Sequence, residues 1–332
     1  MRITREILLG IVRDTIARRA RLDRGLMAVY LCGSMLGDEF MLGGAGDVDL
    51  VFIHDEAPPV EREIVHLADE VHLDIAHHSE KDYRQARQLK EDPWLGPALK
   101  SCRALHDPRH FLDFTQASVR GQYERADHIF ARARRQLERA RSLWFGLQSG
   151  SADPEPKRTL NYLRAVGLAA NAIASLSGPP LTERRFLLDF PARAEALERP
   201  GLFAGLLGLL GAPNLPAGVL PAWLASWAQA YAALGDERPA RLHPARNLYY
   251  ARAFEALLNS PRPETVLWPL LRTWTLAADH LSAEAQERAD WQQAVGQLGL
   301  LGAGLVERLQ ALDSYLDLVD ETQETWAKTN GV

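Results

Sequence analysis

Residues 27–54 read MAVYLCGSMLGDEFMLGGAGDVDLVFIH, and they carry the clearest indication of the fold. A hydrophobic run ends in Gly33-Ser34, and a glycine-rich loop then leads to Asp47-Val48-Asp49 at the start of a second hydrophobic run. Short apolar runs bounded by glycine are typical of buried strands. We therefore expect strands at 27–32 and 48–54, and the residues just after the Gly-Ser turn allow a short helix.

A third hydrophobic run, Val71–Ala76, carries Asp74 at its middle. On a strand, residues two apart project to the same face about 6–7 Å apart, so Asp47 and Asp49 point together while Val48 turns into the core. If the third strand lies beside the second, a strand spacing of about 4.8 Å brings Asp74 to the same place. Carboxylates gathered in this way bind divalent ions, and Asp74 is either a further ligand or a general base.

The Gly33-Ser34 turn adds a second half to this pattern. A strand that ends in Gly-Ser and enters a helix offers backbone N–H groups and a hydroxyl to phosphate oxygens. Glycine also lets the backbone approach a ligand closely. An Asp-x-Asp pair alone is often a solvated turn, but the turn and the acids in this order suit a metal-bound triphosphate.

This order of features resembles the DNA polymerase beta-like nucleotidyltransferase superfamily. Within it, the size and the helical carboxy-terminal half resemble the aminoglycoside nucleotidyltransferases of the kanamycin and streptomycin type. Residues 27–78 carry the resemblance. It implies Mg²⁺-dependent transfer of a nucleoside monophosphate from ATP or another NTP to an acceptor hydroxyl, with release of pyrophosphate.

The resemblance also implies roles for individual residues. Gly33 and Ser34 would hold the triphosphate. Asp47 and Asp49 would bind metal, and two Mg²⁺ ions are expected. Asp74 would be either the third metal ligand or the general base.

A triphosphate also needs cations beyond the metal ions. Lys157 and Arg158 open the first helix after a proline-rich linker, and we take them as the candidate nucleotide contacts. Solvated surface cations are the competing interpretation, and the alternative contacts are Arg84, Arg87 and Lys100.

Two departures from the family pattern keep other functions open. The loop between Gly-Ser and Asp-x-Asp is longer than usual and glycine-rich, and Gly46 stands where a serine is common. We expect a small hydroxylated molecule as the acceptor. The alternatives are nucleotidylation of a protein or a tRNA end, as in antitoxin-like relatives, and a nucleotide-binding scaffold without catalysis.

The segments around the three strands predict helices. Apolar residues at helical spacing indicate a helix over residues 4–22, and Pro58-Pro59 is expected to open a second helix that reaches Asp69. Ser79 has the side chain of an N-cap for a helix that reaches about Leu89. Residues 98–105 fit a strand or a helix equally.

From about residue 113 onward the pattern is helical. We therefore expect an α/β (α+β) nucleotidyltransferase head with a small mixed sheet over residues 1–115, and an all-α bundle over 116–332 that selects the acceptor. A linker is expected near 149–157. A helix is expected over 159–176, and further helices near 202–211, 220–234, 245–258, 264–280, 283–300 and 304–328.

The composition is that of an ordinary soluble globular protein, with 47% hydrophobic and 24% charged residues among 332. A net charge of −5 argues against a nucleic acid as partner. The cysteines, Cys32 and Cys102, are too few for a disulfide framework or a zinc cluster, which favours the cytoplasm. The charged amino terminus is unlike a secretory signal.

Residues 200–235 contain no charged side chain. Pro213, Pro216 and Pro221 divide this segment into pieces too short to span about 30 Å of hydrocarbon, so we expect no membrane partner. Two buried helices joined by a proline-rich turn are the main interpretation. A homodimer interface is the alternative.

Overall fold

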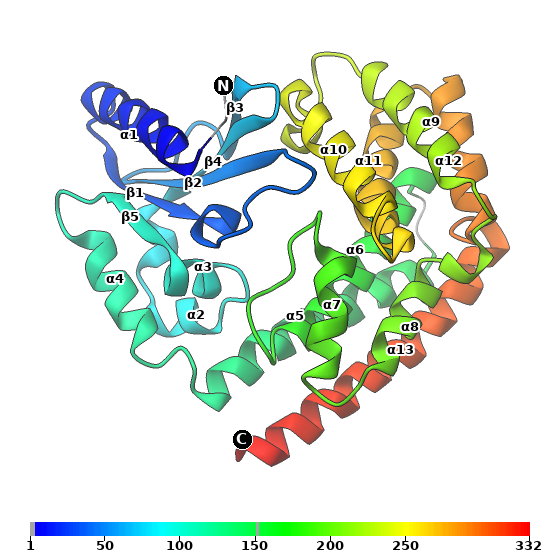
Figure 1. Ribbon diagram of the computed structural model, residues 1–332. Helices are drawn as coiled ribbons and strands as arrows, with labels where there is room; N and C mark the ends of the chain where they lie inside the picture. Colours follow the sequence, from blue (N-terminus) through cyan, green and yellow to red (C-terminus); the bar gives the residue numbers. More distant parts are fainter. Residues whose placement is uncertain (1–3, 151–152) are drawn as a thin grey trace. The chain divides into compact units, whose positions relative to one another are not determined.

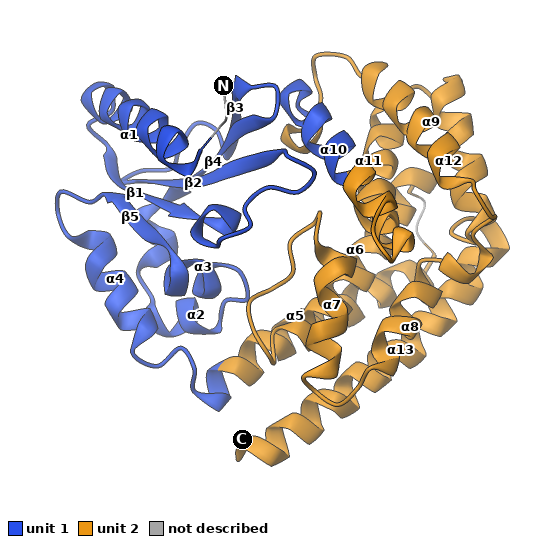
Figure 2. Ribbon diagram, in the orientation of Figure 1, with its two compact units in different colours: residues 1–128, 243–253 blue, residues 129–242, 254–332 orange. Residues whose placement is uncertain are grey.

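The computed structural model describes residues 4–150 and 153–332 (Figure 1). An amino-terminal mixed sheet is followed by a helical remainder, as the sequence predicts. The chain divides into two compact units (Figure 2): unit 1 is Met1–His128 with His243–Ala253, and unit 2 is Ile129–Leu242 with Phe254–Val332. Ser151 and Ala152 of the expected linker lie outside the described residues, and the expected boundary at residue 115 stays a prediction.

The sheet of unit 1 has five strands in the order β3-β4-β2-β1-β5. The central neighbours β2 and β4 pair in parallel, and the remaining pairs are antiparallel. The strand bounds are Leu26–Cys32 for β1, Gly46–His54 for β2, Arg62–Ala68 for β3, Val71–Ser79 for β4 and Arg103–His106 for β5.

Strand alternation separates two hydrophobic cores in unit 1. On one face, Val48 and Leu50 of β2 pack with Leu73 of β4 and with helix α1 (Arg5–Leu22). The opposite face packs against the short helices that precede and follow β5 in the sequence (Figure 1). These helices are α2 (Ala86–Glu91), α3 (Leu95–Ser101) and α4 (Phe111–Arg120). The odd-numbered β2 residues Val51 and Ile53 belong to this second core, so Asp47 and Asp49 share their face.

The helix expected over residues 58–69 is wrong, because this segment forms the edge strand β3 (Arg62–Ala68). It pairs antiparallel with β4 and is only half-buried. Its neighbouring β-branched residues, Ile64 and Val65, favour an extended backbone. The apolar residues also recur at helical spacing, so periodicity alone did not separate the two structures.

Three shorter segments differ in detail from the expectation. The helix allowed after the Gly-Ser turn is a single 3-10 turn, Gly33–Leu36. Ser79 does cap a helical turn and its side chain accepts from Lys81 N, but that turn is 3-10 and ends at Tyr83. The ambiguous residues 98–105 divide between α3 and β5.

The rest of the described chain is helical. The expected helix over 159–176 and the six expected from residue 202 onward are present with shifted ends. Helix α7, which contains Pro191, was not among the expected helices. The bounds are α5 (Ala126–Gln148), α6 (Glu155–Ala174), α7 (Phe186–Glu195), α8 (Gly201–Leu209), α9 (Leu220–Ala232), α10 (Asn247–Leu258), α11 (Leu267–His280), α12 (Gln286–Gln297) and α13 (Gly302–Asn330).

Helix α10 divides between the units, because its residues up to Ala253 group with unit 1. Within unit 2, α6 packs against α11 and α13, and α9 packs against α11 and α12. The tryptophans of α9 and α11 are core residues: Trp227 Nε1 donates to Thr273 Oγ1 at 2.9 Å, and Trp268 stacks on Phe186. Among the described helices, none combines the length and apolar character that crossing a membrane requires.

Candidate functional site

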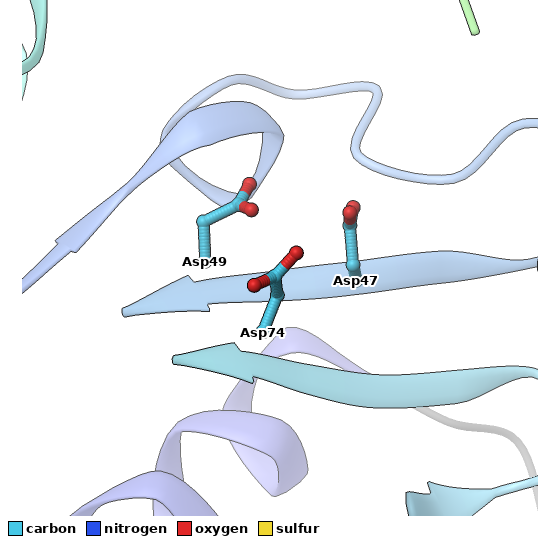
Figure 3. A group of neighbouring side chains, drawn as sticks. All are labelled: Asp47, Asp49 and Asp74. Atoms are coloured by element: carbon cyan, nitrogen blue, oxygen red, sulfur yellow. The ribbon is translucent and has the colours of Figure 1, made fainter. Parts of the chain in front are cut away.

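Three aspartates from the two central strands meet on one face of the sheet (Figure 3). Asp47 and Asp49 project from β2, and Asp74 projects from β4, where the parallel register places it opposite Asp49. One carboxylate oxygen of each residue lies within 4.8 Å of those of the other two. The acids converge because β2 and β4 are neighbours, as the sequence argument required.

The cluster concentrates negative charge in a poorly hydrated place. Asp47 and Asp74 are buried, and Asp49 is half-buried. Burial, followed by the nearby carboxylates of Asp47 and Asp74, raises the pKa of Asp49 well above its ordinary value. A cation placed among these oxygens would relieve both effects.

Two arginines already bind the carboxylate of Asp74. Arg62 of β3 donates from Nε to Asp74 Oδ1 at 2.6 Å, and its side chain is 48% exposed. Arg246 donates from Nη2 to Asp74 Oδ2, and its side chain is only 8% exposed. Both oxygens of this carboxylate therefore accept charge-assisted hydrogen bonds, which are stronger than neutral ones.

Arg246 reaches the cluster from segment 243–253, which contains the 3-10 turn Pro244–Arg246 and the first residues of α10. Its Nε donates to His72 Nε2 at 3.1 Å. Burial alone would lower the pKa of Arg246, but Tyr250, Asp74 and other acidic neighbours outweigh it and raise the pKa above the ordinary arginine value. The guanidinium is therefore a permanent cation.

The same segment also contacts the other side of the cluster. The hydroxyl of Tyr249 donates to Asp47 Oδ2 at 2.7 Å. The Tyr249 ring meets His72 edge-on, with 5.0 Å between ring centroids. Segment 243–253 thus supplies a cation to Asp74 and a neutral donor to Asp47.

The Gly33-Ser34 turn lies directly beside the Asp49 carboxylate. Gly33 has a φ of +72°, and a Cβ at this position would lie 1.9 Å from Asp49 Oδ2. Both facts require glycine, because other residues adopt this φ with strain and would collide with the carboxylate. The hydroxyl of the next residue, Ser34, donates to the Phe40 carbonyl oxygen at 3.3 Å.

Lys157 and Arg158 lie in the first turn of α6, in unit 2. Lys157 Nζ is 3.1 Å from Asp153 Oδ1. It lines a pocket of about 230 Å³ within unit 2, together with the cationic side chains of Arg164, Arg241 and Arg272. Their contact with a nucleotide stays a prediction.

Sequence reasoning missed Arg62, Arg246 and Tyr249. Residues 62–68 form a strand that pairs with β4, and Arg62 lies opposite Ala76, two positions after Asp74. Assigning this segment to a strand would therefore have placed Arg62 near the acids. Arg246 and Tyr249 carry no local signal, because they are 172 and 202 positions from the acids that they contact.

The donor set fits a hard divalent cation. Mg²⁺ takes oxygen ligands and is usually held by one or two carboxylates together with substrate phosphates. Asp47 and Asp49 offer such carboxylates on one strand, and the Gly33 turn lies against the carboxylate of Asp49. A soft metal is not favoured, because the cluster itself is made of carboxylates.

The comparisons with known proteins give no family for this chain. A scan against protein-family models finds no match, and a search of the curated proteins finds no relative.

Proposed function

We propose that this protein is a metal-dependent nucleotidyltransferase. It would transfer a nucleoside monophosphate from an NTP, with ATP as the expected donor, to a hydroxyl of a small acceptor. The observation that carries this proposal is the convergence of Asp47, Asp49 and Asp74 beside the Gly33-Ser34 turn.

The three acids lower the stability of the fold by their mutual repulsion and burial, which supports a functional role for them. Carboxylates this close repel one another, and burial adds to that cost. The chain nevertheless builds them on adjacent strands and places a glycine at position 33, where a side chain would collide with Asp49. Such an arrangement is typical of a site that binds a cation and a phosphate group together.

The proposed reaction has a simple balance of atoms. The oxygen of the acceptor hydroxyl attacks the α-phosphorus and forms the new P–O bond, and Asp74, as the candidate general base, would take the hydroxyl proton. The bond from the α-phosphorus to the bridging oxygen of the β-phosphate breaks, and pyrophosphate leaves with that electron pair. Bound Mg²⁺ would supply charge neutralisation on the triphosphate, and Asp47 and Asp49 are the residues that would hold it.

The helical unit is the proposed place for acceptor selection. Its pocket is lined by Lys157, Arg164, Arg241 and Arg272. Asp153 and Glu183 pair with three of these cations, so a ligand group that carries negative charge would have to replace a carboxylate partner. Acceptors that combine a hydroxyl with a phosphate or carboxylate group therefore belong in any substrate panel, beside aminoglycosides and neutral polyols.

The direct test follows the label of α-labelled ATP. The protein is incubated with Mg²⁺ and the acceptor panel, and pyrophosphate release is measured in parallel. We expect the label on a small product with one pyrophosphate released for each transfer.

Any other result of this experiment would indicate a different function. A label on protein or on tRNA would select the antitoxin-like alternative, and nucleotide binding without pyrophosphate release would select a non-catalytic binding protein. Absence of both binding and transfer with Mg²⁺ and with Mn²⁺ would contradict the proposal.

A further inference from the structure

Arg246 places a buried positive charge inside the acid cluster. Its guanidinium contacts Asp74 Oδ2, and its side chain is 8% exposed. Segment 243–253 belongs to the same compact unit as β2 and β4, so this contact is part of the internal structure of unit 1.

Several neighbours hold this guanidinium in one orientation. His72 accepts from Arg246 Nε at 3.1 Å, and the ring centroid of Tyr249 lies 5.7 Å from Arg246 Cζ. Tyr249 in turn donates to Asp47. The arginine is therefore one member of a network that extends from Asp74 to Asp47, on two sides of the cluster.

Asp74 has both of its oxygens engaged by guanidinium groups, Oδ1 by Arg62 and Oδ2 by Arg246. A divalent ion that used Asp74 as a ligand would have to compete with a buried ion pair, and separating such a pair leaves a charge unpaired away from water. At Asp47, a divalent ion would meet a neutral donor, the hydroxyl of Tyr249.

We propose that Arg246 is a resident cation of the acid cluster and takes the place of a second divalent ion. The protein then binds one ion, at Asp47 and Asp49. This inference rests on the proposed function for that one ion, and it replaces the two ions that the family resemblance implies. It agrees with the ordinary coordination of Mg²⁺ by one or two carboxylates and substrate phosphates.

The number of bound Mn²⁺ ions tests this inference without measuring catalysis. The full-length protein is titrated with Mn²⁺, alone and with a non-hydrolysable α,β-methylene analogue of ATP, and bound ions are counted by electron paramagnetic resonance. We expect one ion on the wild-type protein. Arg246→Gln should bind two, and their spectra should show spin coupling because paired ions lie about 3.5–4 Å apart.

Two further variants test whether the ion count depends on the positive charge of residue 246 itself or on the loss of any guanidinium from Asp74. Arg246→Lys keeps a cation at the site and should still bind one ion. Arg62→Gln removes the other guanidinium from the same carboxylate, but Arg62 is half-exposed at the sheet edge, so the count should also remain one. Two ions on Arg62→Gln would show that lost charge alone admits the second ion, which overturns the assignment to Arg246.

The remaining outcomes are also decisive. Two ions on the wild-type protein would overturn the inference, and this measurement needs no variant and so does not depend on whether Arg246→Gln folds. One ion on a folded Arg246→Gln would overturn it as well. No ion on any form, with or without the nucleotide analogue, would instead contradict the proposed function itself.

Discussion

Strands β2 and β4 and segment 243–253 contribute to the same acid cluster in different ways. The strands supply three carboxylates from residues that lie within 28 positions of one another in the sequence. The segment supplies a guanidinium and a hydroxyl from residues that are 172 and 202 positions from their partners. The negative half of the site is local in sequence, whereas much of the positive half depends on the path of the chain.

The two halves of the site differ in how freely their residues can be changed. An acid on β2 cannot move by one position without turning to the opposite face of the sheet, because side chains alternate along a strand. Segment 243–253 meets the cluster through side-chain contacts rather than through the ladder of the sheet. Its residues therefore set the charge of the site without setting the sheet geometry.

We expect the greatest loss of activity from substitutions in the strand half, at Asp47 and Asp49. Replacing Asp47 or Asp49 by Asn keeps the size and removes the negative charge, so metal binding should be lost. We expect nucleotidyl transfer to fall by about 1000-fold or more, since a metal ion contributes several kcal/mol to such a reaction. Labelled-ATP transfer measures the effect, and circular dichroism checks that the fold is intact. Retained activity in both variants would show that the cluster is not the metal site.

The second prediction concerns the contribution of segment 243–253 to the stability of the protein. Arg246→Ala leaves a buried carboxylate with one partner fewer, and we expect a loss of about 3 kcal/mol in the free energy of unfolding, at the low end for a broken buried pair because Arg62 remains. Arg62→Ala is the matched comparison, because it removes the partner of the other oxygen.

The side chain of Arg62 is 48% exposed, so its removal should cost only about 0.2–1 kcal/mol. Urea denaturation in the presence of EDTA measures both variants without bound metal. Equal losses for Arg62→Ala and Arg246→Ala would show that burial does not distinguish the two arginines.

The third effect returns to the strand half, at the turn that follows β1. Gly33→Ala introduces a Cβ that would lie 1.9 Å from Asp49 Oδ2, so the carboxylate must move. A displacement of about 1 Å at a reacting centre costs about 100-fold in rate, and the left-handed φ adds about 1–2 kcal/mol of strain.

Gly44→Ala provides the control for this change. Gly44 also has a positive φ, of +81°, but a Cβ there would meet nothing within 4 Å. We expect it to share the loss in stability, measured by thermal unfolding, and to keep the transfer rate. If both variants lose the same amount of activity, backbone strain explains the result and the Asp49 contact does not.

The strand half of the site could be predicted from the sequence, whereas the half supplied by segment 243–253 could not. Strands β1, β2 and β4 and the shared face of Asp47 and Asp49 follow from local alternation, whereas the contact between Gly33 and Asp49 was not predicted. The edge strand β3 could not be separated from a helix by periodicity, and Arg62 was lost with it. Arg246 and Tyr249 required the chain path, because nothing in the composition of residues 243–253 specifies which strands they contact.

The smallest expected effect tests the hydroxyl that segment 243–253 offers to Asp47. Tyr249→Phe keeps the ring that lies edge-on to His72 and removes the hydroxyl that donates to Asp47 Oδ2. A hydrogen bond to a charged group contributes about 1.5–3 kcal/mol, but a bound metal ion can replace the lost donor. We therefore expect a loss of about 1.5 kcal/mol in EDTA that shrinks when Mg²⁺ is added. The free energy of unfolding is measured by urea denaturation with and without Mg²⁺. If Tyr249→Phe lowers it equally in both conditions, the ion and Tyr249 do not share Asp47, and segment 243–253 is not part of the metal site.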